Sequence, residues 1–311
     1  MKWLFATPVL MCTAALAQDN PFEEDWDEDW GAAEERIVWN GWAEGAFGRR
    51  LSDEALLNEQ NTLAEVRGRI EGEWRPEHAV FSFRGDVWYD DVTGQLRGEI
   101  RDLSVNASIG SQIDVRLGQQ VLTWGTGDLL FLNDLFPKDF VSFFAGRDDE
   151  YLKAPGAAIR VSHYGAFANV DVVWSPVFDP DVYLDGRRFS FFSPLAGSNV
   201  APRPPLSAVR PERQIDNGEF ALRIFKTIDS REYAAYAYRG FFKQPLALTA
   251  AFDARFARMT ALGASLRQPL GPGLFNAEFS WYSSREDRKG TNPRIPNGQI
   301  RMLAGYEWEA R

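Results

Sequence analysis

Cysteine is almost absent from this 311-residue chain, which has one, Cys12. It lies in an N-terminal stretch typical of a secretory signal: a charged second residue, the apolar run Trp3–Leu16 and a small-x-small site at Ala15–Ala17. We expect residues 1–17 to be a signal peptide that is removed before Gln18, rather than a buried strand or helix. The exported chain then has no cysteine, which excludes a disulfide framework.

Long hydrophobic runs are also missing. After the signal, no segment approaches the roughly 18 uncharged apolar residues that a membrane helix needs. That absence excludes a helical membrane protein, but it leaves open a membrane protein built from strands. Aromatic residues make up 14% of the chain and include 11 Trp. An exported, cysteine-free, helix-poor and aromatic-rich chain favours a transmembrane β-barrel.

Recognisable catalytic signals are scarce. The two histidines, His78 and His163, lie in or beside short predicted turns, and the chain has no G-x-S-x-G, H-E-x-x-H or C-x-x-C motif. The acidic clusters at 148–150 and 179–185 do not match a calcium-loop spacing. The chain also lacks a basic stripe, so nucleic acid is not an expected partner. We therefore expect no enzyme activity, no cofactor and no metal site.

The net charge of −10 is concentrated near the N-terminus. Residues 19–35 hold nine acids and no base, so the remainder is nearly neutral. We expect residues 18–35 to form an acidic periplasmic segment. It is either a solvated disordered stretch or, because Phe22, Trp26 and Trp30 interrupt the acids, a docking segment for a periplasmic partner.

From residue 36 the chain divides into segments of about ten residues with period-two alternation. In 62–74, small and apolar residues occupy one face, and five successive charged residues occupy the other, which is typical of a strand between lipid and a water-filled lumen. The alternation slips near 101–103 and 118–120, where we expect bulges. The predicted strands are 37–47, 62–74, 79–90, 96–108, 112–124, 156–163, 166–175, 218–227, 231–240, 255–267, 273–283 and 299–309.

Short and long connections alternate between these segments, as they do in outer-membrane barrels. Tryptophans also sort to the strand ends, with Trp88, Trp174 and Trp281 near the long loops and Trp74 and Trp308 near the short turns. The predicted fold class is therefore all-β: a transmembrane antiparallel up-and-down β-barrel over residues 36–311. We expect about 12 strands in this chain, or more if the chain is a fragment that lacks further strands. Its expected location is the outer membrane of a Gram-negative bacterium.

The chain between 115 and 158 departs from the hairpin pattern. A strand runs into about thirty residues without a hairpin, and such an aromatic excursion needs a surface that water does not offer. We expect 125–155 to fold inward as a constriction loop. The aromatic residues assigned to the constriction are Trp124, which directly precedes this loop, and Phe131, Phe136, Phe140, Phe143 and Phe144 within it.

Arginine supplies most of the basic charge that the alternation directs inward. The expected pore-lining residues are Arg67, Arg69, Arg84, Asp86, Arg101, Arg116, Arg160, Arg223 and Arg239. Acids on the same strands nearly balance these arginines, so no strong field of one sign is expected. Either the pairs stiffen the wall, or Arg84, Arg101 and Arg116 form an anion-contacting ladder.

The stretch Arg116-Leu117-Gly118-Gln119-Gln120-Val121-Leu122-Thr123-Trp124-Gly125 resembles porin-like outer-membrane barrels of proteobacteria, in particular the alginate-export-type channels. The stretches 237–241 and 292–297 are similar to those families as well. Gln119 stands where an arginine is common in the family, so no substrate role is carried over to it. The resemblance implies passage of a solute or polymer without specifying which one.

Two functions follow as expectations. The first is an outer-membrane channel that passes small polar or anionic solutes, or an exported polymer. The second is a structural barrel that docks an envelope complex through its acidic segment. The expected surroundings are outer-membrane lipid and lipopolysaccharide.

Overall fold

The computed structural model describes residues 37–127 and 129–309. The expected signal peptide and acidic segment, 1–17 and 18–35, lie outside the described residues. Among the residues that are described, no helix has the length and apolar character needed to cross a membrane.

Twelve antiparallel strands form one sheet in which each strand pairs with the next one along the chain. They are β1 (Val38–Arg49), β2 (Asn61–Trp74), β3 (Ala79–Asp90), β4 (Gln95–Ile109), β5 (Ile113–Val121), β6 (Pro155–Tyr164), β7 (Asn169–Ser175), β10 (Glu219–Ile228), β11 (Arg231–Phe241), β14 (Arg258–Leu270), β15 (Gly273–Ser284) and β16 (Gln299–Trp308). The predicted all-β, up-and-down order is confirmed. The largest boundary errors are three residues: β14 lies three residues later than expected, β5 ends three residues earlier and β7 begins three residues later.

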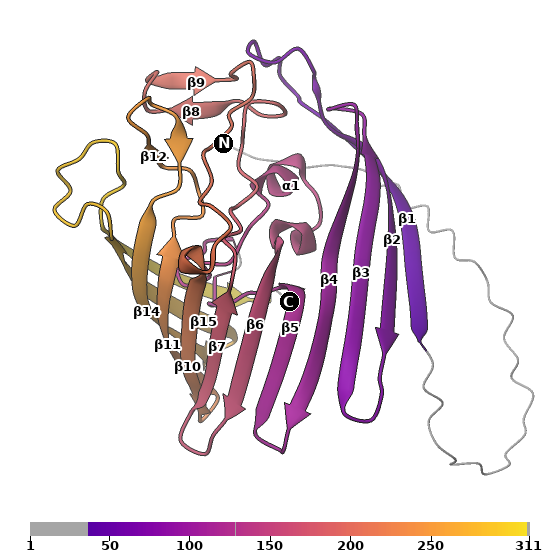
Figure 1. The fold of residues 1–311 in the computed structure, drawn as a ribbon, viewed down its shortest axis with the longest axis vertical. Coiled ribbons are helices and arrows are strands. Elements are labelled where there is room, and N and C mark those ends of the chain that lie inside the picture. The colour runs from indigo at the N-terminus through magenta and orange to yellow at the C-terminus, as the bar shows by residue number, and fades with distance from the viewer. Residues whose placement is uncertain (1–36, 128, 310–311) are drawn as a thin grey trace, which may run out of the picture.

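Short and long connections alternate along this sheet. The short turns at 75–78, 110–112, 165–168, 229–230 and 271–272 lie at one end, which is the lower end in Figure 1. The connections at 50–60, 91–94, 122–154, 176–218, 242–257 and 285–298 lie at the other end, and all of them except the four-residue 91–94 are longer than the short turns. They contain short elements that the sequence analysis did not predict: β8 (Phe191–Ser193), β9 (Ser198–Val200), β12 (Ala247–Leu248), β13 (Ala254–Arg255), α1 (Phe140–Ala145), η1 (Asp149–Leu152) and η2 (Ile215–Asn217).

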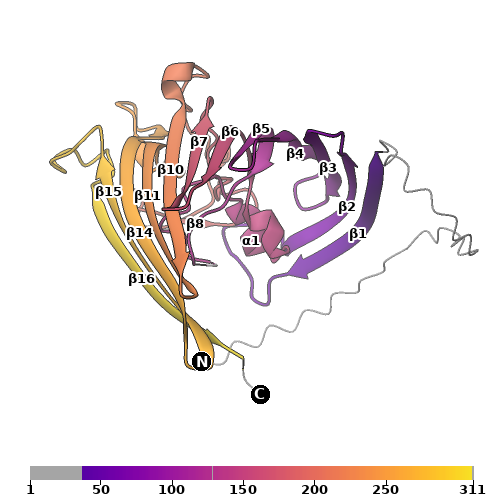
Figure 2. The same cartoon turned by 90° about the horizontal axis from the view of Figure 1, so that it is seen from below.

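The sheet curves around the chain that follows β5, and α1 lies on its concave side (Figure 2). β1 and β16 form the two edges, and in the described part of the chain they do not pair with each other. The curvature brings strands that are far apart in sequence around one interior. The described sheet is thus an open, barrel-like wall.

The alternation of side chains gives the sheet two different faces. In β2, Val66 and Ile70 are more than half exposed on the convex face, whereas Arg67 and Arg69 are 4% exposed on the concave face. Other strongly exposed convex residues are Leu96, Leu103, Leu117, Phe220, Leu262, Trp281, Ile300 and Met302. The convex face is therefore apolar and open, and the concave face is polar and covered.

A register shift interrupts the pairing of β3 with β4. Arg84 pairs with Asp102, but Gly85 pairs with Ile100, so Arg101 is an extra residue in β4. A bulge of this kind lets two consecutive side chains share one face. The bulge expected near 101–103 is therefore present. At the second expected position, 118–120, β5 pairs with β6 throughout and with β4 as far as Gln119, and neither register shifts.

Candidate functional site: the inward segment and the concave wall

Residues 122–154, here called the inward segment, connect β5 to β6. Local hydrogen bonds shape the segment: the Asp139 carboxylate accepts from Ser142 N at 2.8 Å and caps α1, and the left-handed Gly146 (φ 80°) ends it. Asp148 caps η1 by accepting from Glu150 N at 3.0 Å. Burial raises the pKa of the Asp139 carboxyl, although Ser142 donates to it.

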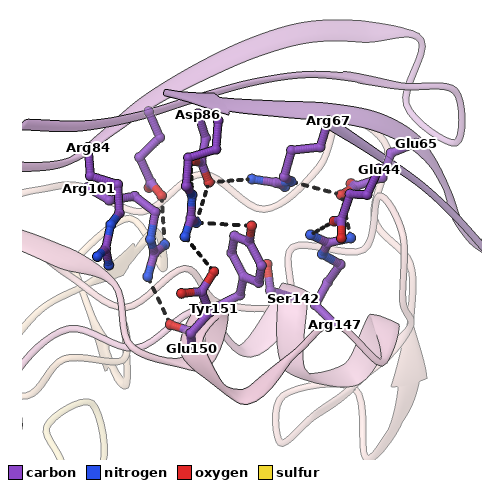
Figure 3. A network of polar contacts seen from close by, with 12 residues as sticks. Glu44, Glu65, Arg67, Arg84, Asp86, Arg101, Ser142, Arg147, Glu150 and Tyr151 are labelled. Carbon is purple, nitrogen blue, oxygen red and sulfur yellow. Dashed lines mark hydrogen bonds and ion pairs between the residues drawn. The ribbon is translucent and has the colours of Figure 1, made fainter. Parts of the chain in front are cut away.

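The two ends of the segment's central part lie side by side. Lys138 and Lys153 form an antiparallel bridge, and Asp139 N donates to Leu152 O at 2.8 Å. Residues 139–152 are therefore a closed loop with α1 and η1 inside it. This loop packs against the concave side of the wall formed by β1 to β4 (Figures 2 and 3).

Tyr151 is the centre of the contact with that wall (Figure 3). The residue is 4% exposed, and Arg69 Nη2 donates to its hydroxyl at 3.0 Å. Burial, and after it the nearby Asp86 carboxylate, raises the pKa of Tyr151 to about 12. The guanidinium carbons around its ring lie at 4.6 Å (Arg67), 5.3 Å (Arg69), 5.0 Å (Arg101) and 4.4 Å (Arg147) from the centroid.

Carboxylates alternate with these arginines and compensate their charge. The Asp86 side chain is fully buried and accepts from Arg67 at 3.1 Å and from Arg69 at 2.6 and 2.9 Å. Glu65 lies 3.1 Å from both Arg67 and Arg147. The network also contains the pairs Arg147–Glu44 and Arg69–Glu150. Most of these charges have at least two partners, so this contact is a distributed network.

Arg101, the bulge residue of β4, binds the C-terminal end of the inward segment. Its Nη2 donates to the carbonyls of Glu150 and Lys153, both at 2.8 Å, and its Nη1 lies 3.0 Å from Glu99. The bulge directs this side chain under the segment rather than into open space. Of the predicted pore-lining residues, Arg67, Arg69, Asp86 and Arg101 are all buried in this contact.

Glu278 of β15 holds the start of the segment against the opposite wall. Its Oε1 accepts from Thr126 N, from Thr126 Oγ1 at 3.1 Å and from Gly127 N at 3.1 Å. Its Oε2 accepts from Asn133 N at 3.3 Å and from Asn133 Nδ2 at 3.0 Å. One carboxylate thus satisfies five donors of a loop that has no regular secondary structure. Tyr282, on the same face of β15, donates its hydroxyl to Leu132 O at 2.6 Å.

Aromatic packing supports this second contact. Trp124 and Phe136 are buried, and their ring centroids are 4.9 Å apart at an interplanar angle of 77°. Trp124 also lies 6.2 Å from Tyr236 of β11. The other predicted constriction aromatics differ: Phe131, Phe140 and Phe143 are half-buried and Phe144 is exposed. The buried part of the aromatic set therefore lies at the wall formed by β11 to β15.

A row of ion pairs crosses the concave face outside these two contacts. Its predicted members Arg84, Arg116 and Arg160 keep 41%, 32% and 35% of their side chains exposed. The pairs are Arg84–Glu71 (2.9 Å), Arg116–Asp102, Arg160–Asp171 (3.3 Å) and Arg223–Glu232 (2.7 Å). Each arginine has a carboxylate partner, yet three of them remain accessible to a small solute.

Arg239 lies on the other face, which corrects its assignment to the pore lining. Tyr236 and Tyr238 of β11 are buried on the concave side, and Tyr233 is 43% exposed on the convex side. Arg239 has the parity of Tyr233 and pairs with the exposed Phe220 of β10. Tyr233 and Tyr236 are three residues apart and therefore face opposite sides of the sheet. Because large residues occupy both faces of β11, the sequence alone does not show which face is lumenal.

Sequence reasoning missed the roles of three residues: Tyr151, Arg147 and Glu278. Alternation placed Glu278 on the lumenal face, but neither pattern nor spacing indicated which loop it would hold. Tyr151 and Arg147 lie in a stretch without periodicity. The only signal in the sequence that could have indicated their importance is the uncommon run of aromatic and charged residues around them.

Comparisons with known proteins give matches only among solved structures; no family model and no curated protein matches. An engineered variant of Rh. blastica porin is similar with 12% identity and a TM-score of 0.42, over 88% of this chain and 80% of that one. Salmonella typhi OmpF in complex with daunomycin has 8% identity and a TM-score of 0.39, over 88% and 86%. Vibrio cholerae OmpT has 8% identity and a TM-score of 0.36, over 88% and 84%. The resemblance to alginate-export-type channels stays a prediction.

Proposed function

We propose that this chain is an outer-membrane channel of a Gram-negative bacterium. The observation that carries the proposal is the division of one antiparallel sheet into an exposed apolar convex face and a charged concave face that holds an inward segment. Lipid contacts the convex face, and water and solute occupy the space beside the inward segment. Residues 1–17 direct export and 36–311 form the membrane part.

Hydrocarbon places a further requirement on the sheet, because an unpaired strand edge in a bilayer leaves backbone N–H and C=O groups without partners. The edges of β1 and β16 are therefore paired in the membrane, with each other or with further strands. Backbone amides of both edge strands will exchange slowly in lipid, and fast exchange at either edge would contradict a membrane-spanning wall.

Small polar or anionic solutes, or an exported polymer, are the substrates that the concave face supports. Arg84, Arg116 and Arg160 present accessible guanidinium groups, which bind carboxylates and phosphates with two hydrogen bonds. Arg101 belongs instead to the contact that positions the inward segment. The expected anion-contacting ladder is thus revised to Arg84, Arg116 and Arg160.

Conductance in planar lipid bilayers tests the channel. Because Lys138 and Lys153 are bridged, residues 141–150 can be replaced by two glycines without moving the ends of the loop. This replacement should raise single-channel conductance, because it removes all but the first residue of α1 and half of η1 from the interior. Replacing the exposed outer residues 210–214 by a Gly-Ser stretch of equal length is the control and should leave conductance unchanged. A folded but silent protein would favour the docking barrel.

Reversal potentials test the ladder separately. Replacing Arg84, Arg116 and Arg160 by Gln should shift selectivity towards cations, since three accessible positive charges leave the path. The control replaces Glu71, the partner of Arg84, by Gln and should shift selectivity in the opposite direction. An unchanged reversal potential with lowered heat stability would assign these pairs a structural role only.

A further inference from the structure

Four arginines lie at or just beyond the long-loop ends of β11, β14 and β15. We call Arg239, Arg258, Arg285 and Arg288 the arginine patch; the three strands can be followed in Figure 1. Tyr238, Met259 and Ser284 are 6%, 1% and 1% exposed on the concave face. Adjacent residues of a strand point to opposite faces. Arg239, Arg258 and Arg285 are the neighbours of these three residues on the loop side, so their positions belong to the convex face.

The strand register brings these charges close together. Arg285 N donates to Arg258 O at 3.0 Å, which continues the pairing of Met259 with Ser284, so the two arginines are directly opposite. Arg258 also pairs with Phe241, which makes Arg239 its diagonal neighbour on the same face. Such positions place Cβ atoms about 5 Å and 7–8 Å apart, and like charges there destabilise a sheet. Burial, and then Arg239, Arg258 and Arg288, lower the pKa of Arg285.

Nearby acids do not neutralise the patch. Glu286 is 2.8 Å from Arg255 and accepts from the backbone N of Arg258 at 2.7 Å. Asp287 accepts from Asn292 N at 2.6 Å and is occupied by the turn that follows. Within the described ranges, none of the four arginines makes an ion pair. Arg258 donates to Asn217 Oδ1 at 2.6 Å, and Glu286 acts on Arg258 and Arg285 from beyond ion-pair distance. The patch is therefore a concentration of positive charge that is only partly compensated.

Aromatic residues mark the membrane level of the patch. Arg239 pairs with Phe220, which is 53% exposed and stacks on Trp174 at 6.2 Å between centroids. Trp281 on β15 is 49% exposed on the same convex face. Exposed aromatics of this kind lie at the boundary between hydrocarbon and headgroups. Arg239 is level with Phe220, and Arg258 and Arg285 lie two residues nearer the long loops, so the patch begins at this boundary and extends to the headgroup level of one leaflet.

We propose that the arginine patch binds phosphate groups in the headgroup of an outer-leaflet lipid. Guanidinium groups bind phosphate oxygens with paired, charge-assisted hydrogen bonds, and a phosphate placed between them removes their mutual repulsion. The assignment of the patch to the outer leaflet rests on the proposed membrane function, whereas the clustering of the four arginines does not depend on it. The ligand is a phosphorylated lipid rather than free phosphate, because the patch continues into the apolar, aromatic convex surface.

Lipid binding by the detergent-solubilised full chain tests this site. The probe is purified bisphosphorylated lipid A, and native mass spectrometry measures the lipid retained at increasing concentration. Replacing Arg239, Arg285 and Arg288 by Gln should weaken retention by about tenfold or more. Lipid A without its phosphates should bind the unchanged protein and the triple variant equally weakly. Replacement by Lys should retain part of the binding, since charge is kept but the paired geometry is lost.

The control replaces Arg231 by Gln; this arginine has the convex parity of Tyr233 but lies at the short-turn end of β11. It should retain lipid A as the unchanged protein does. Equal retention by the triple variant and the unchanged protein, or displacement of the lipid by inorganic phosphate alone, would overturn the proposal. The measurement needs no conductance, so a silent channel that still retains lipid A would reject the channel and keep the lipid site.

Discussion

The inward segment contacts the concave wall at two places that use different chemistry. At β1 to β4, several arginines and carboxylates surround Tyr151, and most charges have two partners or more. At β15, Glu278 alone receives five donors, and aromatic side chains fill the space around them. We call these the charged contact and the Glu278 contact.

The difference determines how each contact fails. In the charged contact, the loss of one group leaves its neighbours with other partners, so the damage is shared. In the Glu278 contact, the loss of one side chain leaves five donors unsatisfied at once, and each unsatisfied buried donor costs about 1–3 kcal/mol. The two contacts also lie at opposite ends of the segment, so each can be broken separately.

Glu278→Ala should have the largest effect. We expect it to destabilise the protein by about 5 kcal/mol, limited by local release of the start of the segment. A cysteine at Leu132 reports this release, because the mature chain is expected to have no other cysteine. Leu132→Cys should become reactive to a maleimide, while Leu152→Cys stays protected. Glu278→Gln, which keeps one acceptor, should give an intermediate rate; equal rates for both variants would contradict the single-carboxylate account.

Asp86→Ala should have the next largest effect, about 3 kcal/mol in the free energy of unfolding. The value lies at the lower end for a broken buried pair, because Glu65 still serves Arg67 and Glu150 still serves Arg69. The reporter pattern should reverse, with Leu152→Cys exposed and Leu132→Cys protected. Exposure of both positions in either variant would mean that the segment is released as one unit and that the comparison fails.

Tyr151→Phe sharpens the account of the charged contact. The ring and its contacts with four guanidinium groups remain, and only the hydrogen bond from Arg69 is lost. We expect a loss of about 1 kcal/mol in urea unfolding. Tyr151→Leu should cost clearly more, because the cation–π contacts are lost as well. If the two variants were equally stable, the ring would act only by filling space.

Much of the wall could be predicted from the sequence because strand alternation is local. The five charges of 62–74 set the faces of β2 without knowledge of any neighbour, and the lengths of the connections set the order of the strands. The same method failed at β11, where large residues occupy both faces and Arg239 was assigned to the wrong one. The β14 boundary moved because Pro269 continues the strand to its turn.

The two contacts of the inward segment could not be predicted in the same way. Its aromatic content indicated burial, but burial does not name a partner. Glu278 meets Thr126 across 152 residues, and Tyr151 meets Arg69 across 82. Such contacts depend on how the sheet curves. A single sequence has no local pattern that predicts this curvature, so the partners could not be identified.

The smallest predicted effect is a pH dependence of the charged contact that comes from Asp139. Burial raises the pKa of this carboxyl above its ordinary value of 3.8, and Arg101 and Glu99 of β4 are the charged groups facing it. The attached segment therefore binds this proton more tightly than the released segment. Attachment is strongest below the ordinary pKa and weakens as pH rises through the window up to the raised pKa. Leu152→Cys should then react more slowly as pH falls.

Asp139→Asn isolates this contribution, since Asn also caps a helix N-terminus but does not titrate there. We expect the reaction rate of Leu152→Cys, corrected for the titration of the thiol, to lose part of its dependence on pH. Asp148→Asn, which changes the cap of η1 in the same way, is the control and should keep the slope. An unchanged slope in Asp139→Asn would show that another group of the charged contact takes up the proton, and that release of the segment is not coupled to the cap of α1.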